Sequence, residues 1–240
     1  MNQVPSNCRK VAFFGGSFDP PHLGHLAVAR AARTALGLDT VLFAPVGAQP
    51  LKPAGSTASF DERVAMTRLA IAEEPGFVIS LVDAPKATRK PNYTLDTLEE
   101  LRRGLPSGCG LYCLMGADSF VGLGKWHRAT EIPFVAPLIV ASRPGQRLDG
   151  LRASLPPGLR MEAAVTLDFS ESSEIEIQCY SLVNQAGRRA PFYLLPDLDV
   201  EISASEIRDG RGRGDSMGHP IRRLLPEAVW NYIQAHNLYR

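Results

Sequence analysis

The chain has 240 residues, of which 45% are hydrophobic and 21% are charged, and its formal net charge is +1 at pH 7. These values are close to those of ordinary folded proteins and exclude a disordered or fibrous chain. The near-neutral charge argues against a protein that coats nucleic acid by neutralising phosphates. No apolar run reaches the roughly 18 residues that a membrane-spanning helix needs, and we see no secretory signal core. We therefore expect a cytoplasmic protein with no membrane partner.

The cysteines are also typical of a cytoplasmic protein. Cys8, Cys109, Cys113 and Cys179 form neither a Cys-x-x-Cys pair nor a dense framework. This spacing disfavours both a disulfide scaffold and a structural zinc site, and it predicts buried, reduced thiols.

In chain order, apolar runs alternate with helical patterns. Residues 10–14 form a run that two glycines end, and residues 23–36 have helical periodicity with Gly37 at the C-cap position. Further strands are predicted at residues 40–46, 77–82, 111–115 and 137–142, and further helices at residues 59–74, after a capping box, and 95–103, with Thr94 as N-cap. This alternation predicts a Rossmann-like α/β fold, a doubly wound parallel sheet with ligands at the carboxyl ends of its strands.

Residues 145–191 interrupt the alternation. Within them, residues 161–169 and 174–180 are candidates for two extra strands, forming a hairpin. We expect one domain over residues 1–240, with this segment as an insertion before the last strand, at residues 192–195. A second capping box at residues 203–206 and a helix at residues 226–235 that starts with proline complete the pattern.

The strongest functional signal lies between the first strand and the first helix. The eleven residues are Gly15-Gly16-Ser17-Phe18-Asp19-Pro20-Pro21-His22-Leu23-Gly24-His25. Glycines before a helix start let backbone N–H groups approach a phosphate chain, and the helix dipole favours an anion there. His22 and His25 can lie on one side of the helix start and face the same ligand. Two such histidines alone are most often solvated, but the glycines and prolines around them favour a phosphate site.

This run resembles the G-G-x-F-x-P-x-H-x-G-H signature of the nicotinate and nicotinamide mononucleotide adenylyltransferases, within the H-x-G-H nucleotidyltransferase superfamily. The segment Ile202-Ser203-Ala204-Ser205-Glu206-Ile207-Arg208 is similar to their I-S-[SA]-T-x-I-R motif, with Ser205 in place of threonine. The alternative for this segment is an ordinary N-cap with a surface arginine. The resemblance implies a Rossmann-like sheet, Mg²⁺, and transfer of AMP from ATP to a mononucleotide with release of pyrophosphate.

From the two motifs we predict ATP contacts and catalytic roles. The ATP-binding set is Gly15, Gly16, Ser17, Phe18, Gly24, Lys52, Ser203, Ser205 and Ile207, and the catalytic set is His22, His25 and Arg208. Lys52 follows Leu51, where nicotinate-type enzymes often have histidine, so one family contact is missing. The attacking phosphate monoester is already mostly dianionic at neutral pH. We therefore expect charge stabilisation rather than base catalysis, with Mg²⁺ carried mainly by the phosphates and Asp118 as a candidate direct ligand.

The acceptor is indicated by three further segments. Residues 91–98 resemble the P-S-Y-T-x-x-T-L segment of bacterial nicotinate-nucleotide enzymes, residues 116–119 their G-x-D-S segment, and Trp126-His127 their Trp with Tyr or His. The resemblance implies that a pyridine ring stacks on Trp126 and that Thr94 receives its carboxylate. Asp118 would bind ribose hydroxyls. The predicted mononucleotide-binding set is Thr94, Gly116, Asp118, Trp126 and His127.

Each of these residues also has a structural alternative: Trp126 as core filler, and Thr94 and Asp118 as helix caps. We interpret the chain as an enzyme that makes deamido-NAD from ATP and nicotinate mononucleotide. The rival acceptor is nicotinamide mononucleotide, while pantetheine-phosphate adenylyltransferases and small cytidylyltransferases are disfavoured by the aromatic and Tyr-Thr segments. A nucleotide-binding regulator without turnover, and an RNA-binding role for Arg208, Arg211, Arg213, Arg222 and Arg223, are the alternatives from other classes. The oligomeric state stays open, with a homo-oligomer among the options.

Overall fold

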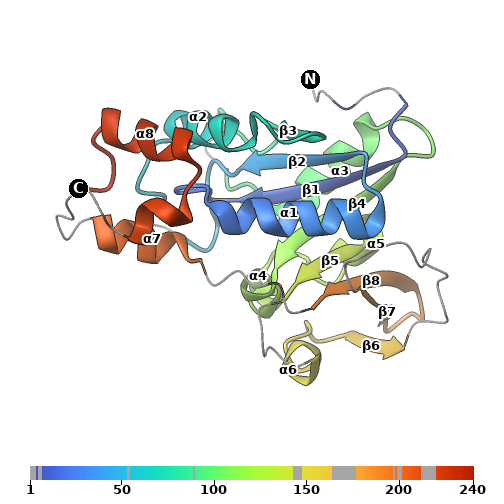
Figure 1. The fold of residues 1–240 in the computed structure, drawn as a ribbon. Coiled ribbons are helices and arrows are strands. Elements are labelled where there is room, and N and C mark those ends of the chain that lie inside the picture. Colours follow the sequence, from blue (N-terminus) through green and yellow to red (C-terminus); the bar gives the residue numbers. More distant parts are fainter. Residues whose placement is uncertain are drawn as a thin grey trace.

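A computed structural model describes residues 4, 7–52, 55–88, 90–142, 148–163, 177–196, 198, 202–211 and 220–240. The described strands form one eight-stranded sheet in the order β3-β2-β1-β4-β5-β8-β7-β6 (Figure 1). The parallel strands are β1 (Lys10–Gly16), β2 (Thr40–Pro45), β3 (Phe77–Ile79), β4 (Gly110–Gly116), β5 (Leu138–Ala141) and β8 (Arg189–Leu195). Two antiparallel strands, β7 (Gln178–Asn184) and β6 (Leu159–Ala163), extend the β8 edge.

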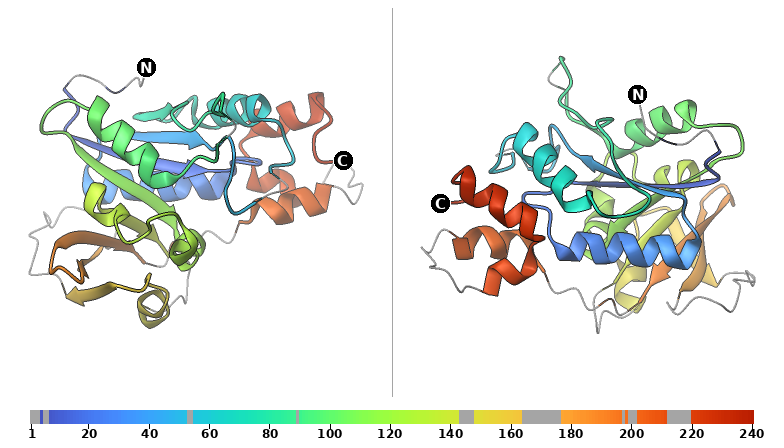
Figure 2. Two further views of the ribbon diagram at one scale, coloured as in Figure 1. Left: turned by 180° about the vertical axis from the view of Figure 1, so that it is seen from behind. Right: turned by 45° about the horizontal axis from the view of Figure 1, so that its top comes forward.

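Helices cover both faces of this sheet, because buried strand residues point to alternate sides. Ala12 and Phe14 of β1 belong to one core cluster, and Val11 and Phe13 to the other. The first cluster is closed by α1 (Leu23–Leu36), α2 (Phe60–Ile71), α7 (Ala204–Arg211) and α8 (Glu227–Ala235). The second is closed by α3 (Thr94–Gly104), α4 (Ala117–Val121) and α5 (Ile132–Val135). Figure 2 shows α1 and α3 on opposite faces.

Three further short helices also contribute buried residues to these two clusters. They are α6 (Leu148–Ala153) and the 3₁₀ helices η1 (Leu123–Lys125) and η2 (Pro220–Leu224). The C-terminal helices α7 and α8 gather at the end of the molecule toward which β1 and β2 point (Figure 1). The chain end therefore lies on the same side as the carboxyl ends of the central strands.

The predicted alternation of strands and helices is confirmed. The first helix has the predicted bounds, and Gly37 caps it with a left-handed backbone (φ 59°) while donating its N–H to the Arg33 carbonyl. The capping box at the start of α2 is present, since Ser59 Oγ accepts the Glu62 N–H and Glu62 returns a bond to the Ser59 N–H. The second helix ends at Ile71, three residues before its predicted end.

One prediction needs correction, and the structure refines two others. Thr94 is the first residue of α3 and not its N-cap, a position that Tyr93 occupies without a side-chain bond. The sheet is not wholly parallel, because β7 returns antiparallel to β8 through a turn in which Gly187 has a positive φ of 77°. The predicted hairpin exists as β6 and β7, with Leu159 opposite Asn184, but residues 164–169 and 174–176 of the two predicted strands lie outside the described residues.

The four cysteines are free thiols. Cys8 and Cys113 are buried, and burial raises the pKa of each to about 12. Cys109 and Cys179 are half-buried. Within the part of the chain that the structure describes, none of the helices is both long and apolar enough to cross a lipid bilayer.

Candidate active site

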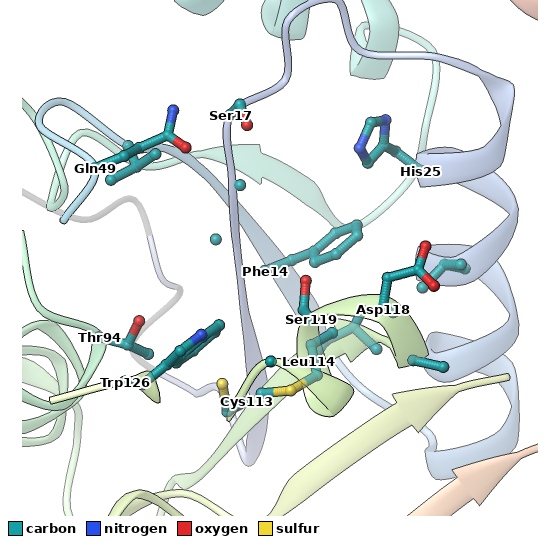
Figure 3. A pocket seen from close by; sticks show the side chains of 18 of the residues that line it. Phe14, Ser17, His25, Gln49, Thr94, Cys113, Leu114, Asp118, Ser119 and Trp126 are labelled. Atoms are coloured by element: carbon teal, nitrogen blue, oxygen red, sulfur yellow. The ribbon is translucent and has the colours of Figure 1, made fainter. Parts of the chain in front are cut away.

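A cavity of about 780 Å³ opens at the carboxyl ends of β1, β2, β4 and β5, where a doubly wound sheet binds its ligands. It brings together most of the residues that the sequence predicted. They are Gly15, Gly16, Ser17, His22, Gly24, His25, Lys52, Thr94, Gly116, Asp118, Trp126, His127 and Ser203. Figure 3 shows Thr94 and Trp126 together on one side of this cavity, with Ser17 and His25 on the other.

The chemical state of His25 follows from its surroundings. His22 is the N-cap of α1, and its backbone N–H donates to His25 Nδ1 at 3.2 Å. Burial, and then the neighbouring His22, hold the pKa of His25 well below its usual value. A neutral ring whose Nδ1 accepts a hydrogen bond carries its proton on Nε2. His25 is therefore a neutral donor at the edge of the cavity, with its ring centre 3.7 Å from that of His22.

Two glycines of the site differ in what surrounds them. A Cβ at Gly15 would come within 2.6 Å of the Phe13 ring, so packing within the protein already requires glycine there. At Gly116, which ends β4, an added Cβ would meet nothing within 4 Å. Since Gly116 lines the cavity, the open space beside it is available to a ligand.

The loop after β2 brings a cation to the first turn. Lys52 Nζ lies 3.4 Å from Ser17 Oγ, and both residues line the cavity. Leu51, at the position where the family often has histidine, is 54% exposed. Lys52 can therefore reach an anion held by the β1 turn, whereas Leu51 supplies no polar group there.

The second motif starts a helix at the cavity. Glu206 accepts the Ser203 N–H at 3.2 Å, which is one of the two bonds of the predicted capping box, while Ser203 Oγ accepts the Ser205 N–H at 3.2 Å instead of the Glu206 N–H. Arg208 Nη1 donates to the Asp19 carbonyl at 2.6 Å and Nη2 to Ser205 Oγ at 3.1 Å. The guanidinium thus lies behind the cradle, and the cavity wall contains Ser203 but neither Ser205 nor Arg208.

Two predicted ATP contacts are contradicted for their side chains. Phe18 and Ile207 are each 1% exposed and belong to the core cluster on the α1 face. Phe18 packs edge-on against Phe14, and the Ile207 N–H is already donated to the Ser203 carbonyl. Both side chains therefore pack in the core beneath the cavity wall and do not face the cavity.

At the other end, Trp126 is half-buried against the core cluster of the α3 face while also lining the cavity. The His127 ring packs against the Tyr93 ring, with ring centres 4.4 Å apart and the planes tilted by 33°. Thr94 opens α3 beside them. An aromatic wall next to a helix start suits a flat ring that carries an anionic group.

Several residues that build the site were not predicted from the sequence. Asn92 is buried and joins the loop after β2 to the loop before α3, because it exchanges two bonds with the Ala48 backbone, at 3.0 Å each, and donates to the Ala84 carbonyl at 3.2 Å. Asp83 lines the cavity and accepts a short hydrogen bond from the Thr97 hydroxyl. Burial raises the pKa of Asp83 to about 6, although Thr97 and Lys86 act in the opposite direction. The sequence also did not single out Asp19, Arg63 and Tyr239, whose hydrogen bonds hold the turn of the first motif.

Comparison with known proteins gives one family. Residues 13–210 match the family model described as cytidylyltransferase-like. The chain is 35% identical to the probable nicotinate-nucleotide adenylyltransferase of Solibacter usitatus (96% of this chain, 99% of that protein). It is 39% identical to the probable nicotinate-nucleotide adenylyltransferase of Laribacter hongkongensis (96% of this chain, 94% of that protein).

Solved structures show the same fold. The nicotinic acid mononucleotide adenylyltransferase of Plasmodium falciparum complexed with NaAD superposes with a TM-score of 0.67 at 17% identity, covering 96% of this chain and 97% of that one. A putative nicotinate-nucleotide adenylyltransferase from Vibrio parahaemolyticus gives a TM-score of 0.58 at 16% identity, covering 97% and 96%. With the full-length relatives above, these findings establish that the chain belongs to the nicotinate-nucleotide adenylyltransferase family.

Proposed function

We propose that this enzyme transfers the AMP group of ATP to nicotinate mononucleotide, forming nicotinate adenine dinucleotide and pyrophosphate. The observation that carries the proposal is one cavity with a cradle for phosphates at the His22–His25 end and an aromatic wall at the Trp126 end. Such a cavity holds the two substrates with their phosphates between the two ends. The names of relatives that match over nearly the whole chain support the same reaction.

In this reaction the phosphate oxygen of the mononucleotide attacks the α-phosphorus of ATP, and the bond to the β-phosphate oxygen breaks. The nucleophile needs no base because it is already anionic at neutral pH. What the protein supplies is in-line placement of two anions and donors for the growing charge on pyrophosphate. His25 donates from Nε2 without bringing a fixed charge of its own, and Lys52 adds a mobile cation. Arg208 does not line the cavity, and its guanidinium donates to the Asp19 carbonyl and to Ser205 Oγ, so we propose that it contributes by holding the turn that carries the two histidines.

A divalent ion, which we propose is Mg²⁺, would neutralise charge on the phosphates. The described residues contain no group of three or more His, Cys, Asp or Glu side chains placed to hold a metal. Asp118 lines the cavity as a carboxylate at the start of α4. This donor set fits an ion that the phosphate oxygens hold, with Asp118 as the protein's contribution.

The acceptor is the finer part of the proposal. The N–H groups at the start of α3 favour an anionic substituent on the pyridine ring, and this supports nicotinate. Asp83 lines the same cavity as a second carboxylate, and when ionised it favours a neutral amide. Nicotinamide mononucleotide is therefore the second candidate acceptor.

The deciding experiment supplies ATP and Mg²⁺ with either mononucleotide and identifies the dinucleotide by mass. We expect kcat/KM for nicotinate mononucleotide to exceed that for the amide by at least about tenfold, or about 1.4 kcal/mol. Trp126→Ala should raise KM for the mononucleotide more than KM for ATP. Product from the amide alone would reverse the choice of acceptor. No dinucleotide with either substrate would refute the proposed reaction.

A further inference from the structure

Asp19 is a buried carboxylate, 3% exposed, in the turn that carries the two histidines. Its Oδ2 accepts the Thr57 N–H at 2.7 Å, and its Oδ1 accepts the Ala58 N–H at 3.1 Å. The Tyr239 hydroxyl donates to the same Oδ1 at 2.8 Å. One carboxylate thus fastens the β1 turn to the end of the loop after β2 and to the C-terminal tail of the chain.

Arg63 of α2 fastens the same segments through their carbonyls. This residue is 2% exposed, and it donates to Ser17 O at 2.7 Å, Val46 O at 2.8 Å and Ala58 O at 3.3 Å. A buried guanidinium is tolerated only when its N–H groups are satisfied, so these bonds fix the carbonyls in place. Val46 and Ala58 flank the loop that carries Lys52. Both ends of that loop are therefore tied to the turn that carries His22 and His25.

The tail reaches Asp19 through an unusual backbone. After α8, Asn237 donates its N–H to Gln234 O at 3.3 Å and Leu238 donates to Ile233 O at 3.1 Å, which closes the helix as a Schellman motif. Asn237 has the left-handed φ of 55° that this motif needs. Tyr239 is left-handed again, with a φ of 60°, although nothing in the motif requires it.

A left-handed tyrosine persists only where its surroundings compensate for the strain. Here Tyr239 is 8% exposed within the core cluster of the α1 face, and its hydroxyl donates to Asp19. Arg208 approaches the same turn and donates to the Asp19 carbonyl at 2.6 Å. The Asp19 turn is thus held from α2, from α7 and from the tail.

We propose that Tyr239 is a positioning residue for the ATP end of the site: through Asp19, its hydroxyl sets the spacing between the histidine turn and the Lys52 loop. The proposal rests on the proposed function only in taking the ATP phosphates as the ligand of this cradle. Tyr239 itself does not line the cavity. The pyridine end, built by α3 and Trp126, lies outside the linkage.

The test is Tyr239→Phe, which keeps the ring and removes the hydroxyl. Calorimetric titration with a non-hydrolysable ATP analogue and Mg²⁺ should show a Kd raised about tenfold, or about 1.4 kcal/mol, because the unmodified protein holds the cradle at the spacing that the phosphates need and the variant must be ordered on binding. Steady-state KM for ATP should rise similarly, while KM for the mononucleotide should stay within about twofold. A chain that ends at Leu238 should weaken analogue binding further than Tyr239→Phe does.

Tyr232→Phe is the matched control, because Tyr232 lies on α8 and its ring stacks on His236 rather than reaching the site. It should bind the analogue as the unmodified protein does. Unchanged analogue binding in both Tyr239→Phe and the shortened chain would overturn the inference. So would an equal rise in both KM values accompanying a lowered Tm, because that pattern marks general destabilisation. An unmodified protein that does not bind the analogue would instead refute the proposed function.

Discussion

His25 offers one ring nitrogen to a ligand, because the other already accepts the His22 N–H. Its lowered pKa favours a neutral ring near pH 7 in the unliganded protein, so the hydrogen bond to phosphate that we propose would add no positive charge to that of Lys52. We expect His25→Ala to reduce kcat on the order of 10²-fold, comparable to the loss of one oxyanion donor, with a smaller change in KM for ATP. The measurement is pyrophosphate release at saturating substrates.

The matched control for this prediction is His236→Ala. His236 follows α8, where its Nδ1 lies 2.9 Å from the Tyr232 carbonyl, and it should leave kcat nearly unchanged. Turnover of His25→Ala at the unmodified rate would remove this residue from the reaction.

Asp83 makes stability depend on pH. Because burial raises its pKa from 3.8 to about 6, the folded protein binds the Asp83 proton more tightly than the unfolded chain does. The protonated Asp83 therefore stabilises the fold fully below pH 4, and this stabilisation is lost as the pH rises through 6. Asparagine cannot ionise, so the unfolding free energy of Asp83→Asn does not fall in this way. The difference in unfolding free energy between Asp83→Asn and the unmodified protein should be more favourable to the variant at pH 8 than at pH 4.5, by on the order of 2 kcal/mol.

Urea unfolding at the two pH values measures this difference. Thr97 is the hydrogen-bond partner of Asp83, and Lys86 and Glu100 are the charged groups that act on it. The control is Glu73→Gln, at an exposed carboxylate. An Asp83→Asn gain that is equal at both pH values would show that the carboxyl is not perturbed.

Site residues could be predicted from the sequence where they lie in one local motif, but not where they meet only through contacts between distant positions. His22, His25 and Gly15 lie within one short run, where spacing alone indicates a phosphate cradle. Tyr239 reaches Asp19 across 220 positions and Arg63 reaches Ser17 across 46, so neither contact leaves a local pattern. Phe18 and Ile207 were assigned to ATP because they stand inside the motifs, and only packing shows that they point into the core.

At the scale of elements, the helix ends follow local rules that mutation can test. Gly37 has a φ of 59°, and an added Cβ would meet nothing within 4 Å, so Gly37→Ala should cost only the left-handed backbone, about 1 kcal/mol. Gly104 ends α3 without a positive φ and also has open space around an added Cβ. Gly104→Ala should therefore be neutral or stabilising, by up to about 1 kcal/mol.

Thermal unfolding of both glycine variants gives the comparison directly, since neither residue lines the cavity. The expected result is a lower Tm for Gly37→Ala and an equal or higher Tm for Gly104→Ala. Equal losses in both would mean that the αL cap is not what Gly37 contributes.

The best-predicted elements are a helix with a clear cap and a strand that is buried on both faces. The first helix has a glycine cap, and β2 is buried at all six positions, so both patterns were strong. The strand β6 is mixed in burial because it lies at the sheet edge, and the residues between β6 and β7 carry no clear period. The antiparallel return depends on the turn around Gly187, whose positive φ the sequence alone did not indicate.

At the scale of the whole molecule, the predicted insertion continues the main sheet. Strand β7 pairs with β8 and β6 with β7, so the described part of residues 145–191 shares the sheet that carries the site. Leu182 of β7 and Phe192 of β8 lie in the core cluster on the α3 face. We therefore propose that residues 1–240 fold as one domain, and that loss of the β6–β7 hairpin would expose this core.

We expect turnover to require a divalent metal ion, whereas the stability of the unliganded protein should not depend on one. The described residues offer no cluster of three or more metal-ligating side chains, so no structural ion is expected to hold the fold together there. EDTA should abolish dinucleotide formation while leaving the Tm of the unliganded protein unchanged. ATP alone should stabilise less than ATP with Mg²⁺, whose stabilisation reaches about 2.7 kcal/mol at 100 times Kd. The Tm measured with and without chelator and nucleotide decides the matter: a fall on adding EDTA to the unliganded protein would mean that a metal is built into the fold.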